Sequence, residues 1–101
     1  MTIEYIRYQI PASAEGAFEK AYHAAQASFE ASPHCLAWEL ARGVEEPDRF
    51  ILRIEWTSVE GHMQGFRKSP EFAPFLALVR PYIDNIEEMK HYERTSVGSA
   101  V

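Results

Sequence analysis

The side chains best suited to chemistry are a histidine and a phenylalanine four residues apart. His62 and Phe66 lie in the segment EGHMQGF, and this spacing places them on one face if the segment is helical. An imidazole beside a pocket can take a proton from a phenol or hydroquinone and so act as a general base. The plainer alternative is a partly solvated histidine near a helix start, with Phe66 in the core.

Two tryptophans and an arginine are further candidates for ligand contacts. Trp38 and Trp56 can stack on an aromatic ligand, although large aromatic side chains at alternating strand positions are more often core. The alternation groups Trp56 with an apolar set that faces the helices, so we expect it in the core, and it leaves both alternatives open for Trp38. Arg53 falls on the opposite face of the same strand, beside Glu55. We favour a structural Arg–Glu network across a dimer interface, and the alternative is an oxyanion site.

The other reactive residue types form no recognised motif. No two histidines are four residues apart and no histidine–carboxylate pair has a metal-ligand spacing, so we predict no metal site. The five glycines are dispersed, which excludes a phosphate-binding loop. The single cysteine, Cys35, lacks an activating motif and is expected to be an inert buried thiol. His91 and Tyr92 fall near the end of the chain, either at a ligand entrance or at a solvated edge, and His23 and His34 are expected at the surface.

Composition indicates one globular domain. The 101 residues are 47% hydrophobic, and the net charge of −5 with scattered basic residues makes a nucleic-acid partner improbable. The first residues lack the apolar core of a signal peptide and no stretch approaches a membrane span, so we expect a soluble, cytoplasmic protein without a membrane partner. Residues 1–94 are predicted to form the domain, and residues 95–101 a mobile tail.

These candidates need a scaffold, and the periodicity of the chain predicts one. Alternating apolar residues predict strands, while apolar residues at helical spacing predict helices. The predicted elements are a strand over 2–10, a helix over 13–31, strands over 34–43 and 49–56 joined as a hairpin, two helical stretches separated by Ser69-Pro70, and a strand over 82–93. This order is a ferredoxin-like split βαββαβ arrangement of the α+β class, with a four-stranded antiparallel sheet and both helices on one face.

The second face of the predicted sheet is not plainly polar. We expect it to carry Tyr5, Cys35, Ala37, Ile51 and Met89 among charged residues. Such a face would leave much apolar area in water, so we expect two sheets to pack face to face in a homodimer.

Three segments resemble a known family. They are CLAWEL after a Ser-Pro break, EEPDRFILRIEW, and EGHMQGFRKSPEFAPF, and the resemblance spans roughly residues 3–93. The chain resembles the antibiotic biosynthesis monooxygenase domain of the dimeric α+β barrel superfamily. The resemblance implies a homodimeric barrel and a cofactor-independent monooxygenase for a small aromatic or quinol-like molecule. His62 would be the base, Phe66 and Trp38 would sandwich the ring, and Arg53 would steady negative charge.

The same superfamily includes haem-degrading enzymes, which the residues argue against. In those proteins an iron-binding histidine follows a serine by seven residues, and here that position is Leu76, which cannot bind iron. A haem-binding relative with altered ligands is therefore disfavoured. A second alternative is a non-catalytic ligand-binding or assembly module on the same scaffold.

Overall fold

The protein is described by a computed structural model that covers residues 1–99. Six main elements follow one another as β1 (Thr2–Gln9), α1 (Glu15–Ala31), β2 (Cys35–Arg42), β3 (Arg49–Trp56), α2 (Phe72–Val79) and β4 (Ile86–Glu93). Four short helical turns complete the fold: η1 (Ala12–Ala14), the π-helical turn η2 (Gly61–Gly65), and the 3-10 turns η3 (Phe66–Lys68) and η4 (Arg80–Asn85).

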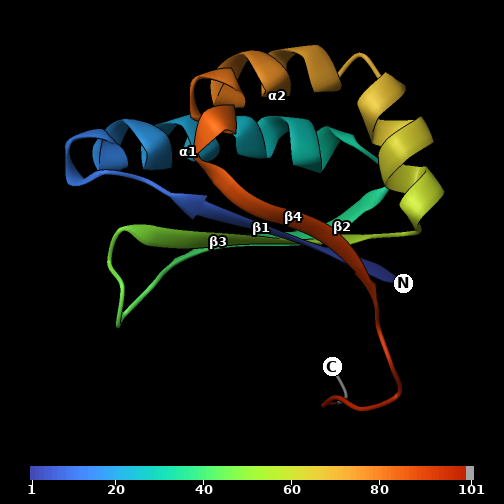
Figure 1. Ribbon diagram of the computed structural model, residues 1–101. Coiled ribbons are helices and arrows are strands. Elements are labelled where there is room, and N and C mark those ends of the chain that lie inside the picture. The colour runs from blue at the N-terminus through green and yellow to red at the C-terminus, as the bar shows by residue number, and fades with distance from the viewer. Residues whose placement is uncertain (100–101) are drawn as a thin grey trace.

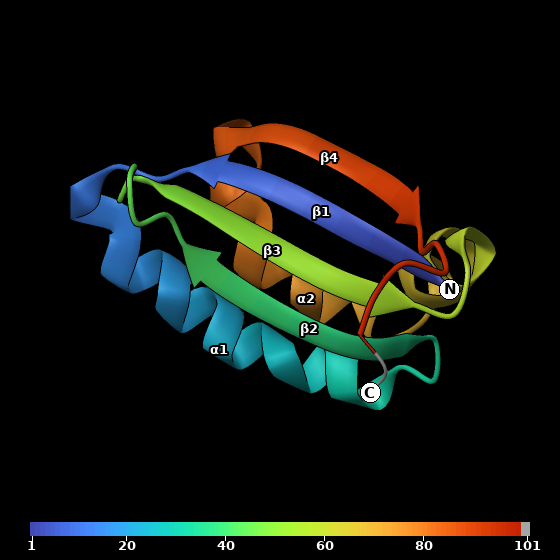
Figure 2. The ribbon, with the colours of Figure 1, turned by 90° about the horizontal axis from the view of Figure 1, so that it is seen from below.

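The strands form one antiparallel sheet in the order β2-β3-β1-β4. Both α1 and α2 cover one face of this sheet, and the opposite face, which we call the outer face, carries no helix (Figures 1 and 2). The predicted α+β class and ferredoxin-like order are therefore confirmed.

Proline and glycine set several of the element boundaries. Pro11 follows the first strand and cannot donate a hydrogen bond to continue it. The helix α1 ends at Ala31, because Ser32 precedes Pro33 and takes an extended conformation at φ −90° and ψ 124°. In the β2–β3 hairpin, a Cβ on Gly43 would lie 2.4 Å from the backbone oxygen of Glu46, so this close approach requires glycine.

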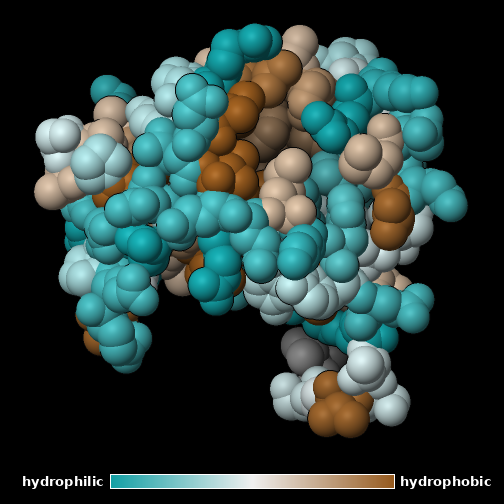
Figure 3. All heavy atoms as spheres, in the orientation of Figure 1, coloured by the Kyte–Doolittle hydropathy of each residue, from teal (hydrophilic) through white to brown (hydrophobic). Residues whose placement is uncertain are grey.

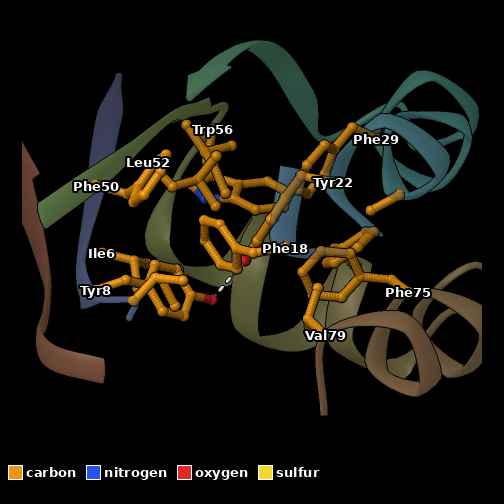
Figure 4. Packing of buried hydrophobic residues seen from close by; sticks show 14 residues of the cluster. Ile6, Tyr8, Phe18, Tyr22, Phe29, Phe50, Leu52, Trp56, Phe75 and Val79 are labelled. Atoms are coloured by element: carbon orange, nitrogen blue, oxygen red, sulfur yellow. Dashed lines mark hydrogen bonds between the residues drawn. The ribbon is translucent and has the colours of Figure 1, made fainter. Parts of the chain in front are cut away.

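The core lies between the sheet and the two helices. β3 alternates strictly, and its helix-facing residues Phe50, Leu52, Ile54 and Trp56 are at most 3% exposed, which confirms Trp56 as a core residue. Opposite them, aromatic rings of the helices pack edge to face on the sheet (Figure 4). The hydroxyl groups of Tyr8 and Tyr22 meet in this core at 2.5 Å, so the only polar atoms of these rings are hydrogen-bonded.

Two residues predicted on the outer face lie on the helix-facing side instead. The pairing of β2 with β3 is irregular between Cys35 and Ala37, and this bulge turns Cys35 toward the core. Burial raises the pKa of its thiol to about 12, which keeps the group protonated. Met89 lies opposite Ile6, which belongs to the helix-facing set of β1.

The last strand begins later than its composition predicts. Residues 80–85 form η4, with Pro81 at a position that favours the first turn of a helix, and β4 starts only at Ile86. Hydrophobicity alone could not separate this turn from the strand, because Tyr82, Ile83 and Ile86 are all apolar.

The outer face is a mixture of apolar and charged side chains. Tyr5 packs edge to face on Tyr92, and Arg53 Nη1 donates to Glu55 Oε2 at 2.6 Å. After β4, residues 94–99 form no helix or strand and extend below the sheet (Figure 1). The predicted tail also includes residues 100–101, which lie outside the described residues. Within residues 1–99, no helix has the length and apolar character needed to cross a membrane.

Candidate active site

The site is organised by the helical segment that follows β3. Ser58 begins it: its Oγ accepts a hydrogen bond from the Gly61 N–H at 2.9 Å, and its carbonyl accepts one from the His62 N–H at 3.2 Å. The next turn, η2, is π-helical, and the Phe66 N–H reaches back five residues to the Gly61 carbonyl. Such wide turns are frequent at functional sites because they realign side chains that an α-helix would separate.

His62 is buried and contacted on three sides. Its ring stacks on Trp56, with ring centroids 4.3 Å apart and planes 13° apart. Nδ1 lies 2.7 Å from Nε2 of His91, and Nε2 lies 3.6 Å from Oε1 of Glu4. These contacts join β1, η2 and β4 at a single imidazole, which is 6% exposed.

Glu4 is the buried acid of the site. It lies on the helix-facing side of β1, between Ile54 of β3 and His91 of β4, and is 2% exposed. Trp56 Nε1 donates a hydrogen bond to Oε1 at 3.1 Å. Trp56 and His62 both approach Oε1, and Glu4 also lines the cavity described below. A buried carboxylate needs such partners, since leaving it without them would be costly.

Burial shifts the pKa values of Glu4 and His62 in the directions that favour the neutral form of each group. It raises the pKa of Glu4 to about 7, although the Trp56 hydrogen bond and the charge of Arg67 oppose this. Burial, with the nearby His91 and Arg67, lowers the pKa of His62 to about 4. Burial also lowers the pKa of His91, and the charge of Arg67 contributes to this shift. Between these two values the Glu4–His62 pair holds one proton, and desolvation places it on Glu4.

An apolar cavity opens beside this pair. It lies between α2 and the β1, β3 and β4 strands, has a volume of about 120 Å³, and includes Glu4, His62 and Phe66 in its wall. Four side chains of α2 complete the apolar side: Phe72, Phe75, Leu76 and Val79. On the surface, a hydrophobic hollow is visible between α2 and β4 (Figure 3).

The size of the cavity limits the ligand. Sites for drug-sized molecules occupy roughly 300–1,000 Å³. The volume here, about 120 Å³, is closer to the ~150 Å³ of an apolar cavity that holds a single benzene ring. The cavity therefore suits one aromatic ring.

The structure brings only some of the predicted site residues together. His62 and Phe66 share the cavity wall, and Phe66 is 1% exposed. Trp38 does not join them: Phe29 lies between, with ring centroids 5.6 Å from Trp38 and 5.9 Å from Phe66. A ring sandwiched between Phe66 and Trp38 is therefore incompatible with this packing.

Trp38 and Arg53 have other surroundings. The Trp38 Nε1 donates to Gln26 Oε1 at 3.0 Å, and its ring borders a separate groove of about 380 Å³ between α1 and β2. Arg53 lies on the outer face, paired with Glu55 and on the opposite side of the sheet from His62. Its partner Glu55 is in the same chain, so the predicted network across a dimer interface stays a prediction, and Arg53 lies on the side of the sheet away from the cavity.

Three residues of the site were not singled out from the sequence: Glu4, His91 in this role, and Arg67. The sequence did contain a signal for Glu4. At every second position of the strand, Glu4 falls on the same face as Ile6 and Tyr8, and a carboxylate is unusual on such an apolar face. No spacing rule connects Glu4, His62 and His91, since they come from three different elements.

The same three residues offer a donor set for a cation. One ligand atom from each of Glu4, His62 and His91 lies within 4.8 Å of the others. Two imidazoles and one carboxylate suit a divalent transition metal. His62 and His91 are within hydrogen-bond distance of each other, whereas the 3.6 Å between His62 and Glu4 is longer than a hydrogen bond. The absence of a metal stays a prediction.

The fold and site define a class of α+β domain in which a buried acid–imidazole pair borders a small apolar cavity. The profile of the antibiotic biosynthesis monooxygenase family matches residues 1–78. The chain belongs to this family, as its resemblance had indicated.

Individual proteins are similar to this chain over nearly its whole length. An uncharacterised Bacillus subtilis protein, YczJ, is 26% identical over 93 residues, which is 92% of this chain and 98% of YczJ. The crystal structure of a Bordetella bronchiseptica protein from the same family superposes with a TM-score of 0.77 at 26% identity, over 93% of this chain and 96% of that one. SnoaB, a cofactor-independent oxygenase from Streptomyces nogalater, shares the fold at a TM-score of 0.73 and 17% identity, with 97% of each chain covered.

Proposed function

We propose that the protein is a cofactor-independent monooxygenase that acts on a single-ring, quinol-like compound. The observation that carries this proposal is the buried Glu4–His62 pair, which holds one exchangeable proton at the wall of a cavity sized for one ring. A base with a pKa near the working pH is the most effective proton acceptor, and Glu4 meets this condition.

The reaction begins with removal of a proton from a ring hydroxyl. The Glu4 carboxylate accepts this proton, with His62 and His91 as the onward path. The electron-rich anion then passes one electron to dioxygen, and the two radicals combine at a ring carbon to give a hydroperoxide. Loss of water leaves a hydroxyquinone, so that a hydroquinone and dioxygen yield a hydroxyquinone and water. The apolar wall strengthens these charge interactions by excluding water.

Oxygen uptake with one-ring hydroquinones tests the proposal. Wild-type protein is expected to consume oxygen, while Glu4→Gln and His62→Ala are expected to lose most of this rate, since general-base catalysis contributes roughly 10²–10⁴-fold. Glu30→Gln is the matched control, because Glu30 is an exposed carboxylate of α1. Equal rates in wild type and Glu4→Gln would remove the pair from the mechanism.

A second candidate is a binding module without turnover. It is favoured by one observation: both nitrogens of His62 already face protein groups, as in a structural histidine. Saturable binding of a hydroquinone without any oxygen uptake would support this candidate over the enzyme. Haem chemistry finds no support, because Leu76 lies in the cavity wall at the position where haem-degrading relatives carry the iron ligand.

We also propose that the protein acts as a homodimer whose outer sheet faces pack together. This face presents Tyr5, Ile51 and Tyr92 between charged residues. Burying it against a second copy would remove this apolar surface from water.

A further inference from the structure

One cationic side chain lines the cavity, and it lies at the rim. Arg67 is exposed to solvent and is also part of the cavity wall. Its guanidinium lies over the ring of Phe72, 5.4 Å from the centroid, and Nη1 is 3.9 Å from the sulfur of Met63. Among residues 1–99, no carboxylate lies within salt-bridge distance of Arg67. Six other basic side chains do have an acidic neighbour within that distance: Arg42, Arg49, Arg53, His62, Lys90 and Arg94.

The charge of Arg67 acts inside the cavity. It contributes to lowering the pKa values of Glu4, His62 and His91, which come from three different elements. The protein as a whole carries a net charge of −5, whereas Arg67 places a positive charge at the cavity.

Arg67 lies in the same helical segment as His62, in the 3-10 turn η3 that directly follows the π-helical turn η2. His62 and Arg67 are five residues apart, and both line the cavity. A ring in the cavity would therefore meet the Glu4–His62 pair at one point and the guanidinium at another.

We propose that Arg67 binds the carboxylate of an aromatic acid, so that the substrate is a hydroxybenzoate-type quinol with its ring in the cavity and its acid group at the rim. This inference rests on the proposed function and names its substrate class. Arginine suits the role because its planar fork donates two parallel hydrogen bonds to a carboxylate. The position at the rim lets the acid group remain partly hydrated while the apolar ring is buried.

Equilibrium binding tests this inference separately from turnover. We expect wild-type protein to bind 2,5-dihydroxybenzoate about tenfold more tightly than hydroquinone, as one charge-assisted pair at an exposed position would give. In Arg67→Gln the two probes should bind equally, and Arg67→Lys should keep part of the preference. Lys68→Gln, a charge removal at the adjacent exposed residue outside the cavity wall, should behave as wild type.

Each outcome decides the inference. Equal affinity of wild type for both probes, no binding of the acid, or a preference that survives in Arg67→Gln would overturn it. Turnover of hydroquinone without an acid preference would retain the proposed function and reject the role of Arg67. Selective, Arg67-dependent binding of the acid without oxygen uptake would retain the role of Arg67 and reject the monooxygenase.

Discussion

Glu4 and His62 titrate in opposite directions for the same physical reason. Burial disfavours the charged form of each, so the pKa of the acid rises from 4.5 to about 7 and that of the imidazole falls from 6.5 to about 4. Between these values the pair is neutral overall and holds one proton. The site can therefore keep an acid and a base 3.6 Å apart without burying a net charge.

This pairing has a consequence for stability. The unfolded chain releases the Glu4 proton near its ordinary pKa while the native protein keeps it, so Glu4 lowers the free energy of unfolding as pH rises from about 4.5 to 7. His62 does the reverse, because only the unfolded chain gains a proton between about 6.5 and 4. Each contribution is about 3 kcal/mol in size. The two should cancel between pH 4.5 and 6.5.

Single substitutions should reveal the separate contributions of Glu4 and His62 to the free energy of unfolding. In Glu4→Gln only the His62 contribution remains, so the free energy of unfolding should rise with pH from 4 to 6.5, relative to wild type. In His62→Gln only the Glu4 contribution remains, so the free energy of unfolding should fall as pH rises from 4.5 to 7, relative to wild type. Urea unfolding followed by tryptophan fluorescence at a series of pH values measures both slopes. Parallel pH profiles for wild type and both variants would contradict the cancellation.

The pH dependence of turnover should report the same acid. Glu4 accepts a proton only when ionised, so kcat/KM for a hydroquinone should rise with pH and level off above about 7. Steady-state oxygen uptake from pH 5 to 9 measures this profile. The step near pH 7 should be missing from the residual activity of Glu4→Gln, and its persistence there would assign it to another group.

Metal removal distinguishes between two roles for Glu4, His62 and His91: proton transfer and metal binding. We expect dialysis against EDTA to leave oxygen uptake unchanged, because the proposed electron transfer runs directly from the substrate anion to dioxygen. Elemental analysis of the protein before and after dialysis is the accompanying control. Loss of activity on dialysis with recovery on adding Fe²⁺ would show instead that the two histidines and the carboxylate ligate iron.

The residue types of the site were partly readable in the sequence. His62 and Phe66 share a short segment, so helical spacing was enough to group them. The pairing of β1 with β4 brings Glu4 and His91, which are 87 positions apart, into register, and His62 approaches them from the separate turn η2. Trp38 was misplaced as a partner of Phe66 because strand alternation gives the face of a residue but not which helical side chain, here Phe29, covers it.

The η2 turn is the element that distinguishes this site from a plain helical wall. A glycine stands at each end of this turn, and both glycines let the turn approach His34 closely. A Cβ on Gly65 would lie 2.4 Å from the nearest carbon of the His34 ring, and one on Gly61 would lie 3.3 Å from its Nδ1. His34, predicted at the surface, is therefore only half-exposed and serves as the support for the turn.

Gly65→Ala should disturb this support. The methyl group must displace the His34 ring or the turn itself, and we expect a loss of about 1–3 kcal/mol in the free energy of unfolding. Adding His34→Ala should restore most of that loss, because the truncated side chain leaves room for the methyl. Urea unfolding of the two single variants and the double variant completes the cycle, and additive losses would contradict a direct clash.

Regular elements were predictable and irregular ones were not. β3 alternates without exception and α1 repeats apolar residues at helical spacing, so both appear close to their predicted bounds. The bulge at Cys35 and the π-helical turn each depart by about one residue from a regular period, and η4 is a 3-10 segment that includes the first residues of the predicted strand. Backbone hydrogen bonding and tertiary packing decide such shifts, and a hydrophobic pattern in one sequence does not record them.

At the scale of the whole molecule, the sheet separates two kinds of surface. The helix-facing side carries the core and the cavity, while the outer face has no helix over it (Figure 2). The outer face combines Tyr5, Ile51 and Tyr92 with charged residues. Some of these charges already pair within the chain, as Arg53 and Arg94 do with Glu55. Satisfied charges between apolar groups can be buried at an interface at lower cost than unpaired ones.

A charge placed on this face should therefore dissociate the proposed dimer. Ile51 lies in the outward-facing set of β3, opposite Arg7 and Ala41, and is partly exposed in the single chain. Ile51→Lys would bring two like charges into a face-to-face interface and remove apolar contacts, whereas Val59→Lys adds the same charge at an exposed position on the helix side. Light scattering after size exclusion should give a dimer for wild type and Val59→Lys and a monomer for Ile51→Lys. Thermal unfolding of Ile51→Lys checks that the monomer is folded, and a monomeric wild type at micromolar concentration would reject the interface.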